Sequence, residues 1–397
     1  MRGSTRKRGK TWTAYWDVTE TDPETGEQVR RQRSKGGFRT QKLAEAHIGE
    51  VLPDVRAGTY VEPTTQTLAD FMLNDWLPGI KNTIRPTTQN RYLGIVQRYI
   101  KPHPIGRIPL SLVSPADINK LYADLEKCSR PGCKHANPDV CRGLAANTLR
   151  SIHTVLSRCL SDAVRWEKVK RNAAKLADPP ALSRKRAQAW SPRELRQFLA
   201  AVEHDRLSAL WRLAATTGMR RGELLGLQWQ TVNLDHGTLR VERQQLADRT
   251  FGPPKSRRSE RTIALDPGTV ESLRQHRATQ QLERGIAGDV YADRDLVFCD
   301  EIGHPLSPGS LTKTFHVHRT KAGIPVGTLH TLRHTAATIA LTATPPVPLH
   351  VVAARLGDKP ETLLGVYAHL LPSSDSQAAD AVASAILVDK PLTTAGD

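Results

Sequence analysis

The feature that most constrains this chain is a group of three short motifs near its C-terminal end: HTLRH at 330–334, RLGD at 355–358 and YAH at 367–369. His330 and Arg333 are three residues apart, which places them on one face of a helix about one turn apart. Tyr367 follows Arg333 by 34 positions. The segment between them has few other polar groups, which is consistent with one or two more helices packing behind the first.

These three residue types suit phosphodiester chemistry. Arginine presents a planar fork that binds two phosphate oxygens, histidine moves protons near neutral pH, and a tyrosine hydroxyl can act as a covalent nucleophile. The alternative is an ordinary amphipathic helix, because HxxR alone occurs often by chance. The residues upstream therefore decide between the two interpretations.

Size and charge narrow the class of protein. A chain of 397 residues predicts two or three domains. No apolar run approaches the ~20 residues that span a bilayer, and the first residues lack the apolar segment of a signal peptide, so we expect a cytoplasmic protein. The net charge of +17 indicates a polyanionic partner. Basic residues occur in every region, which favours an extended contact with nucleic acid, although charge alone does not separate DNA from RNA.

A cysteine-rich insertion at 128–141 offers a possible structural zinc site. Three thiols and an imidazole could form a closed tetrahedral site, and the candidate ligands are Cys128, Cys133, His135 and Cys141. The spacing departs from the usual paired CxxC arrangement, which favours the alternative, a surface insertion with reduced thiols.

The N-terminal region, residues 1–62, reads as a small sheet followed by a helix. Residues 1–10 are basic and are expected to form a mobile arm. Residues 11–18 and 28–34 have the composition of strands, and Thr40 can cap a following helix. Basic side chains gather on the second strand, so we expect the sheet to lie in a DNA groove; the alternative is a solvated hairpin. The candidate DNA contacts are Arg30, Arg31, Arg33 and Lys35.

Residues 66–178 predict a helical bundle. Ser114 followed by Pro115 is a helix start, and apolar residues recur at helical spacing from residue 147 onward. Arg91, Arg150 and Arg158 lie outside the apolar stripes, where they form solvated faces unless the protein clamps DNA. Residues 179–190 form a basic linker. Ser191 and Glu194 then make a capping box that opens a new domain.

That domain begins with a second arginine motif, TGMRRGELLGL at 217–227. Gly218 is expected to end one helix and Glu223 to lie in the first turn of the next, which leaves Arg220 at the junction, free to meet a phosphate. Residues 238–241 and 261–265 predict strands. A basic turn between them carries Lys255, Arg257 and Arg258. The alternatives are a helix corner with surface arginines and a solvated turn.

The order of these motifs resembles that of the tyrosine recombinases, or phage-type integrases. The resemblance covers most of the chain: 191–372 resembles the catalytic domain, 66–178 the core-binding domain and 1–62 the arm-binding domain. It implies a multidomain, mainly α fold. The first domain would be a small α+β arm-binding-like domain, the second a helical bundle, and the third a mixed, mostly α catalytic domain with a small β-sheet.

The resemblance also implies a mechanism without metal or nucleotide cofactor. Tyr367 would attack a DNA phosphodiester and form a 3′-phosphotyrosyl link, and the 5′-hydroxyl released would attack the partner strand. Arg220 and Arg333 would stabilise the pentacoordinate transition state. The remaining implied roles are proton transfer by His330, protonation of the leaving oxygen by Lys255, and support from Glu223 and His369.

Asp358 is a departure from the family pattern, which usually has His, sometimes Trp, after Leu-Gly. An ionised carboxylate cannot donate a hydrogen bond to a phosphate and would repel it. We expect Asp358 to orient another group, with Lys359, Arg355 and His369 nearest in sequence. A less efficient or inactive site is the alternative.

The resemblance implies three kinds of partner: double-stranded DNA with core and arm-type sites, three further protomers in a tetramer to which the tail 373–397 contributes, and host DNA-bending and directionality factors. The expected role is integration or excision of a phage or mobile element. Two other functions stay open: a catalytically silent DNA-binding relative acting as a regulator or accessory factor, and a transposase of the same chemistry.

Overall fold

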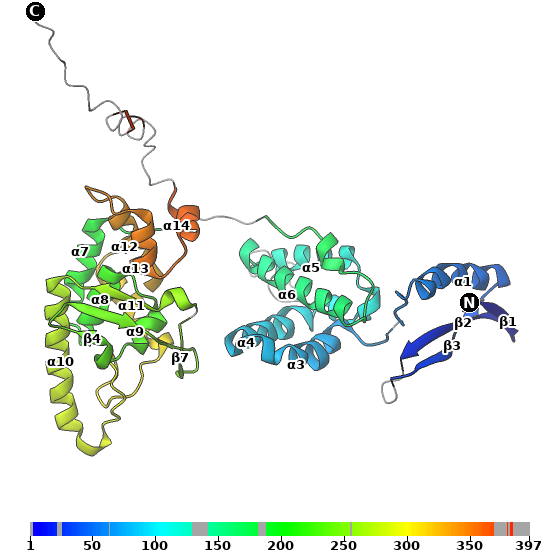
Figure 1. Cartoon of the computed structure of the whole chain (residues 1–397), viewed down its shortest axis with the longest axis horizontal. Helices are drawn as coiled ribbons and strands as arrows, with labels where there is room; N and C mark the ends of the chain where they lie inside the picture. Colours follow the sequence, from blue (N-terminus) through cyan, green and yellow to red (C-terminus); the bar gives the residue numbers. More distant parts are fainter. Residues whose placement is uncertain are drawn as a thin grey trace, which may run out of the picture. The chain divides into compact units, whose positions relative to one another are not determined.

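The computed structural model describes residues 3–21, 26–62, 64–128, 142–181, 188–254 and 256–368, together with 379, 382 and 383. The chain divides into two compact units, residues 1–184 and 185–397 (Figure 1). The division falls inside the segment expected to be a linker. Each unit is mainly helical and carries a small sheet.

The first unit begins with a three-stranded antiparallel sheet in the order β1-β2-β3, followed by one helix. The bounds are β1 (Ser4–Arg8), β2 (Thr11–Thr21), β3 (Gln28–Phe38) and α1 (Gln41–Arg56). The hydroxyl of Thr40 accepts from the Leu43 N–H at 3.3 Å, which confirms the predicted cap. Ala14, Trp16 and Val18 of β2 form a hydrophobic core with Ala44 and Ile48 of α1.

The expectation of a mobile arm at residues 1–10 was wrong, because residues 4–8 form strand β1. Ser4 pairs with Tyr15 and Arg8 with Thr11 in one continuous antiparallel register. Backbone hydrogen bonds to β2 hold this strand. Its exposed, basic side chains give no apolar alternation, which is why the sequence pattern did not reveal it.

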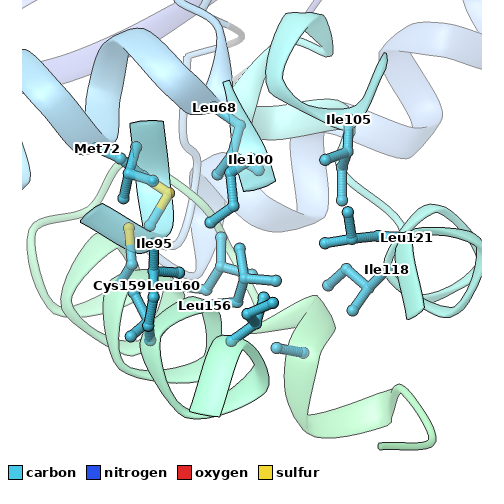
Figure 2. Packing of buried hydrophobic residues seen from close by; sticks show 14 of the residues in the cluster. Leu68, Met72, Ile95, Ile100, Ile105, Ile118, Leu121, Leu156, Cys159 and Leu160 are labelled. Atoms are coloured by element: carbon cyan, nitrogen blue, oxygen red, sulfur yellow. The ribbon is translucent and has the colours of Figure 1, made fainter. Parts of the chain in front are cut away.

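A helical bundle follows in the first unit. Its elements are α2 (Leu68–Asp70), the π-helical η1 (Phe71–Trp76), α3 (Leu77–Gly79), η2 (Lys81–Thr83), α4 (Pro86–Ile95), the π-helical η3 (Val96–Ile100), η4 (Pro104–Arg107), η5 (Leu110–Leu112), α5 (Pro115–Lys127), α6 (Ala146–Arg165) and η6 (Ala173–Leu176). Ser114 and Asp117 form a capping box at the start of α5. Side chains from these helices interdigitate in one buried cluster, part of which is shown in Figure 2.

The second unit is mostly helical with short strands. Its helices are α7 (Pro192–Ala201), α8 (Ser208–Thr217), α9 (Arg221–Gly226), η7 (Trp229–Thr231), η8 (Arg257–Ser259), α10 (Pro267–Ala287), η9 (Gly288–Val290), α11 (Pro308–Lys321), α12 (Leu329–Leu341), α13 (Leu349–Leu356) and α14 (Pro360–Tyr367). Its strands are β4 (Val232–Asn233), β5 (Thr238–Val241), β6 (Gln244–Gln245), β7 (Phe251–Gly252) and β8 (Arg261–Ala264). The sheet order is β4-β5-β8, with β6 and β7 as a separate pair.

Two buried clusters in this unit position the motifs singled out in the sequence. Ser191 and Glu194 form the predicted capping box at the start of α7. A large cluster then joins α7, α8, α9 and α11 to the sheet and to Leu332 of α12. A smaller cluster joins the other side of α12 to α13 and α14, and it includes Tyr367. Helix α12 therefore connects the arginine corner at α8–α9 with the C-terminal tyrosine.

Candidate active site

Arg220 lies at the corner between helices α8 and α9. Gly218 ends α8 with a φ of 65°, in the left-handed region that favours glycine. The backbone N–H of Arg220 donates to the Glu223 carboxylate at 3.0 Å, and its Nη1 donates to the same group at 2.9 Å. The predicted corner is confirmed, and Glu223 fixes the arginine that projects from it.

Glu223 is a buried acid, 2% exposed, that also holds a second cation. Nη2 of Arg261, on β8, donates to its carboxylate at 2.9 Å. Burial alone would raise the pKa of Glu223, but the hydrogen bond and charge of Arg261 and the contacts with Arg220 lower it below its usual value. The carboxylate is therefore ionised and connects β8 to the α8–α9 corner.

Arg333, on α12, is 4% exposed and is held by backbone oxygens from two other segments. Its Nη1 donates to the Gly218 carbonyl at 2.7 Å, and its Nη2 donates to the Leu356 carbonyl at 2.8 Å. Burial, and then the charge of Arg220, lowers its pKa, although Asp358 opposes this. An arginine stays charged in proteins, so this buried cation needs an anion beside it.

Asp358 supplies that anion and joins the two arginines. Its Oδ2 accepts from Nη2 of Arg333 at 2.5 Å, and its Oδ1 accepts from Nη2 of Arg220. The carboxylate side chain is 23% exposed, so solvent reaches it. Two guanidinium groups, one from the α8–α9 corner and one from α12, thus converge on one small anion, an arrangement suited to the oxygens of a phosphate.

The partners of Asp358 differ from those expected from the sequence. Lys359, Arg355 and His369 were the candidates because they are near in the chain. The guanidinium of Arg355 instead donates to the backbone oxygens of Ala264 and Thr216, and His369 lies outside the described residues. The arginines that Asp358 contacts are 138 and 25 positions away. Tertiary packing, rather than sequence proximity, selects them.

Tyr367, at the end of α14, is 5% exposed, and its hydroxyl meets a histidine. The phenol oxygen lies 2.5 Å from Nδ1 of His334 on α12. Burial raises the pKa of Tyr367 to about 12, with Arg333 lowering it and Asp358 raising it. Helix α12 carries both Arg333 and His334, the hydrogen-bond partner of Tyr367, which places the tyrosine in the same site as the paired arginines.

His330 lies one turn before His334 on α12, and the two ring centres are 4.6 Å apart. His330 is exposed as a whole residue. Desolvation by the surrounding protein, followed by the charges of Arg333 and Arg220, lowers its pKa, while Asp358 raises it. His330 is thus a neutral group beside the arginine pair at pH 7.

Several predicted site residues lie outside the described part of the chain. These are Lys255, His369, Cys133, His135, Cys141 and most of the tail 373–397. Cys128 follows α5 and is half-buried. Among the residues that the structure does describe, no cluster of three or more His, Cys, Asp and Glu side chains is arranged to hold a metal ion.

The candidate DNA contacts on β3 fall on two faces of the sheet. Directly paired residues of an antiparallel sheet share a face. Arg31, Arg33 and Lys35 pair with Val18, Trp16 and Ala14, so these three basic side chains lie on the face that carries α1. Arg30 pairs with Thr19 and lies on the opposite, open face. By the same register, Arg6 and Arg8 of β1 share that open face with Arg30.

Two candidate DNA contacts of the helical bundle meet at one tyrosine. The guanidinium groups of Arg91 and Arg158 each lie 5.8 Å from the centre of the Tyr92 ring. Arg150, by contrast, donates to the backbone oxygen of Pro180 at 3.4 Å. In the second unit, Arg258 is exposed on the short helix η8, and Arg257 belongs to the same turn.

Sequence reasoning missed three residues of this site: His334, Arg261 and Ser259. His334 is four positions after His330 and so on the same helix face, a signal that was available in the HTLRH motif. Arg261 and Ser259 gave no local signal. Ser259 is 1% exposed and its Oγ lies 3.4 Å from Nη1 of Arg220, a contact that only the folded chain reveals.

The site thus defines a protein with a preformed anion-binding arginine pair next to a buried tyrosine. Comparison with protein-family models identifies the family to which the chain belongs. Residues 189–373 match the phage integrase family, residues 4–54 an arm DNA-binding domain, and residues 67–125 the N-terminal SAM-like domain of phage integrases. The chain belongs to the phage integrase, or tyrosine recombinase, family.

Individual relatives support this assignment over nearly the whole chain. A XerC-like tyrosine recombinase from Caldanaerobacter subterraneus is 28% identical over 94% of this chain and 96% of its own. An integrase from Streptomyces ambofaciens is 30% identical over 71% of this chain and 70% of its own.

Solved structures show the likeness in fold. The Tn1549 transposon integrase bound to transposon right end DNA has a TM-score of 0.63 at 14% identity, covering 81% of this chain and 100% of that chain. A lambda integrase tetramer bound to a Holliday junction has a TM-score of 0.54 at 18% identity, covering 92% of this chain and 93% of that chain.

Within the described residues, no helix of this chain is long and apolar enough to cross a membrane.

Proposed function

We propose that this protein is a site-specific DNA recombinase that cuts and rejoins DNA through a 3′-phosphotyrosyl intermediate. The observation that carries the proposal is the convergence of Arg220 and Arg333 on a single anion, in the site that holds Tyr367. The Asp358 carboxylate stands where two guanidinium forks would hold the non-bridging oxygens of a scissile phosphate. Family membership supports the reaction class.

The proposed roles follow from charge and position. Arg220 and Arg333 stabilise the negative charge that gathers on the pentacoordinate phosphorus, and they are preorganised by Glu223 and by backbone oxygens. Tyr367 attacks the phosphorus. Lys255 protonates the departing 5′-oxygen, and His330 serves as an acid/base beside the phosphate. Because the phosphotyrosyl bond conserves the energy of the phosphodiester, the reaction needs no nucleotide cofactor.

The proposed substrate is double-stranded DNA with two kinds of site. Residues 191–372 and 66–178 would bind the core site, where cleavage occurs. Residues 1–62 would bind arm-type sites through the open sheet face, which keeps Arg30 of the four predicted contacts and adds Arg6 and Arg8. This face can enter a groove because α1 covers the other one.

We further propose that the protein acts in the cytoplasm as a tetramer on paired core sites, in the integration or excision of a phage or mobile element. The tail 373–397 would join protomers, and host DNA-bending and directionality factors would assist. Removing residues 373–397 should weaken assembly on paired sites in a native gel. Unchanged assembly would refute the role of the tail.

One observation favours a second function, that of a catalytically silent DNA-binding relative. Asp358 already forms ion pairs with both arginines, so a DNA phosphate must displace an internal carboxylate before cleavage. If displacement failed, the protein would still occupy its sites as a regulator or accessory factor. A transposase with the same chemistry and looser target choice differs only in which DNA it accepts.

Covalent trapping on a nicked suicide substrate separates these functions. The protein and a Tyr367→Phe variant would be mixed with DNA flanking the gene and run on a denaturing gel. An adduct formed by the protein and absent from the variant supports the recombinase. DNA binding without any adduct, on intact and nicked DNA alike, supports the silent relative.

A further inference from the structure

The hydroxyl of Tyr367 is partnered by a histidine that the sequence analysis gave no role. Nδ1 of His334 lies 2.5 Å from the phenol oxygen, which is a short hydrogen bond. Both groups lie on elements packed in one hydrophobic cluster, α12 and α14, which restricts their relative motion. His330, to which proton transfer was assigned, lies one turn earlier and beside the arginines.

The two histidines make different contacts in the site. His330 lies about one turn before Arg333 on α12, and the charges of Arg333, Arg220 and Asp358 act on it. His334 touches the nucleophile itself. A proton leaving the tyrosine oxygen has His334 as its nearest acceptor in the described structure.

The electrostatics supply a neutral acceptor at that position. Burial, together with the nearby His330 and Arg333, lowers the pKa of His334 to about 4, while Asp358 raises it. The imidazole is therefore neutral at pH 7, and with its proton on Nε2 it accepts from the phenol through Nδ1. Burial raises the pKa of Tyr367 to about 12, so the hydroxyl keeps its proton until attack begins.

We propose that His334 takes the proton from Tyr367 as the tyrosine oxygen attacks the scissile phosphorus, an inference that rests on the proposed recombinase function. The O–P bond to Tyr367 forms, the bond from phosphorus to the 5′-oxygen breaks, and the tyrosine proton moves to Nδ1 of His334. The departing 5′-oxygen takes its proton from a separate acid. During rejoining the phosphotyrosyl bond breaks, and His334 returns the proton to the tyrosine.

The timing of this transfer follows from the two pKa values. An imidazole with a pKa of about 4 is too weak a base to remove a proton from a phenol with a pKa of about 12 in advance. Proton transfer accompanies O–P bond formation, which makes the phenol oxygen more acidic as it bonds to phosphorus. A positioned base of this kind contributes about 10²- to 10⁴-fold to a rate.

A merely structural hydrogen bond is the competing account, because a buried tyrosine hydroxyl generally needs a partner. His334→Asn distinguishes the two. The amide oxygen of asparagine can accept the hydroxyl from roughly the position of Nδ1, but it does not take up a proton at neutral pH. His334→Ala removes both properties, and His236→Asn, in the exposed β4–β5 turn, is the matched control.

The test measures single-turnover cleavage of a nicked suicide substrate by the full chain, with DNA affinity and melting temperature recorded for each variant. We expect His334→Ala and His334→Asn to cleave about 10²- to 10⁴-fold more slowly than the unaltered chain, with DNA binding retained and His236→Asn unaffected. Cleavage by His334→Asn at the unaltered rate would overturn the proposal and leave only positioning.

A second substrate distinguishes proton removal from Tyr367 from protonation of the 5′ leaving group. With sulfur in place of the scissile 5′-oxygen, the leaving group needs no protonation, whereas the nucleophile still must lose its proton. We expect the His334→Asn defect to persist on this substrate. Its disappearance would assign His334 to the leaving group and overturn the proposal. Absence of any adduct with the unaltered chain would instead refute the recombinase function itself.

If a His334 variant has a lowered melting temperature, His334→Gln replaces it and the same criteria apply.

Discussion

At the scale of single residues, the Asp358 carboxylate accepts hydrogen bonds from the guanidinium groups of Arg220 and Arg333. Under the proposed function, this carboxylate would compete with the DNA phosphate for the two arginines. A neutral hydrogen-bond donor at this position would keep the space filled without the repulsion.

The first prediction concerns that position. Asp358→His should cleave a suicide substrate as fast as the unaltered chain or faster, by about tenfold, because a hydrogen bond to a charged group is worth about 1.5–3 kcal/mol. The single-turnover rate of adduct formation is the measurement, with Asp289→His at an exposed position in η9 as the control. Complete loss of cleavage would contradict the view that Asp358 occupies a phosphate-donor position.

Sequence reasoning identified Arg220, Arg333 and Tyr367, because each stands in a motif whose spacing fixes a helix face or a helix end. It assigned proton transfer to His330 and no role to His334, whose ring contacts the Tyr367 hydroxyl in the structure. Both share one face of α12, and only the packing of α14 against that helix decides which ring the hydroxyl meets. The contacts of Asp358 depended in the same way on tertiary structure.

At the scale of secondary-structure elements, the α8–α9 corner depends on one buried ion network. Glu223→Ala would leave Arg261 buried without its carboxylate partner and Arg220 without its anchor. Breaking a buried pair costs about 3–5 kcal/mol, which corresponds to a fall in melting temperature of about 6–20 °C at 2–4 °C per kcal/mol.

Differential scanning calorimetry measures this second prediction on the transition of the second unit. Glu203→Ala is the matched control, because Glu203 is exposed and a surface substitution changes stability by about 0.5 kcal/mol or less. A melting temperature for Glu223→Ala equal to that of the control would show that the network does not support the corner.

The third prediction compares the effects on stability of replacing two glycines, Gly218 and Gly285, with alanine. Gly218 has a φ of 65°, and a Cβ there would lie 2.5 Å from Cδ2 of Leu356, so Gly218→Ala should destabilise the fold by about 1–2 kcal/mol or more. It should also slow cleavage, since the Gly218 carbonyl holds Arg333. Gly285 lies in α10 with open space around its Cβ position, so Gly285→Ala should stabilise by about 0.5–1 kcal/mol. Equal effects of the two on the melting temperature would contradict this account.

The elements themselves were largely predictable from capping residues and apolar periodicity. Thr40, Ser114 and Ser191 each cap the helix expected to follow them. Strand β1 was not predictable, because its stability comes from pairing with β2 and its own side chains carry no apolar pattern. Local signals thus revealed helices that begin at capping residues, and they missed strand β1, which is held by its neighbour.

At the scale of the whole molecule, the proposed arm-binding surface and the proposed cleavage site belong to different compact units. Substitutions in the first unit can therefore test arm binding without altering the cleavage site. Arg8 and Lys7 are adjacent on β1 and both exposed, but the register puts Arg8 on the open face of the sheet and Lys7 on the face that carries α1. They form a matched pair of basic residues whose side chains lie on opposite faces of the sheet.

The fourth prediction uses this pair. Arg8→Ala should weaken binding to arm-type DNA and reduce the slope of log affinity against log salt by about one phosphate contact. Lys7→Ala should do so much less. Cleavage of a core-type suicide substrate should be unchanged in both variants. Equal losses of arm-site affinity, measured by salt titration, would contradict the proposed groove-facing surface.

The most direct test of the central claim is to locate the covalent link by mass spectrometry. After cleavage of a suicide substrate, the adduct would be digested with nuclease and trypsin. We predict a phosphonucleotide on the tyrosine of the peptide that begins at Leu356, attached through the 3′ end of the cut strand. A link to another residue, or to a 5′ end, would contradict the assignment of Tyr367 as the nucleophile of this recombinase.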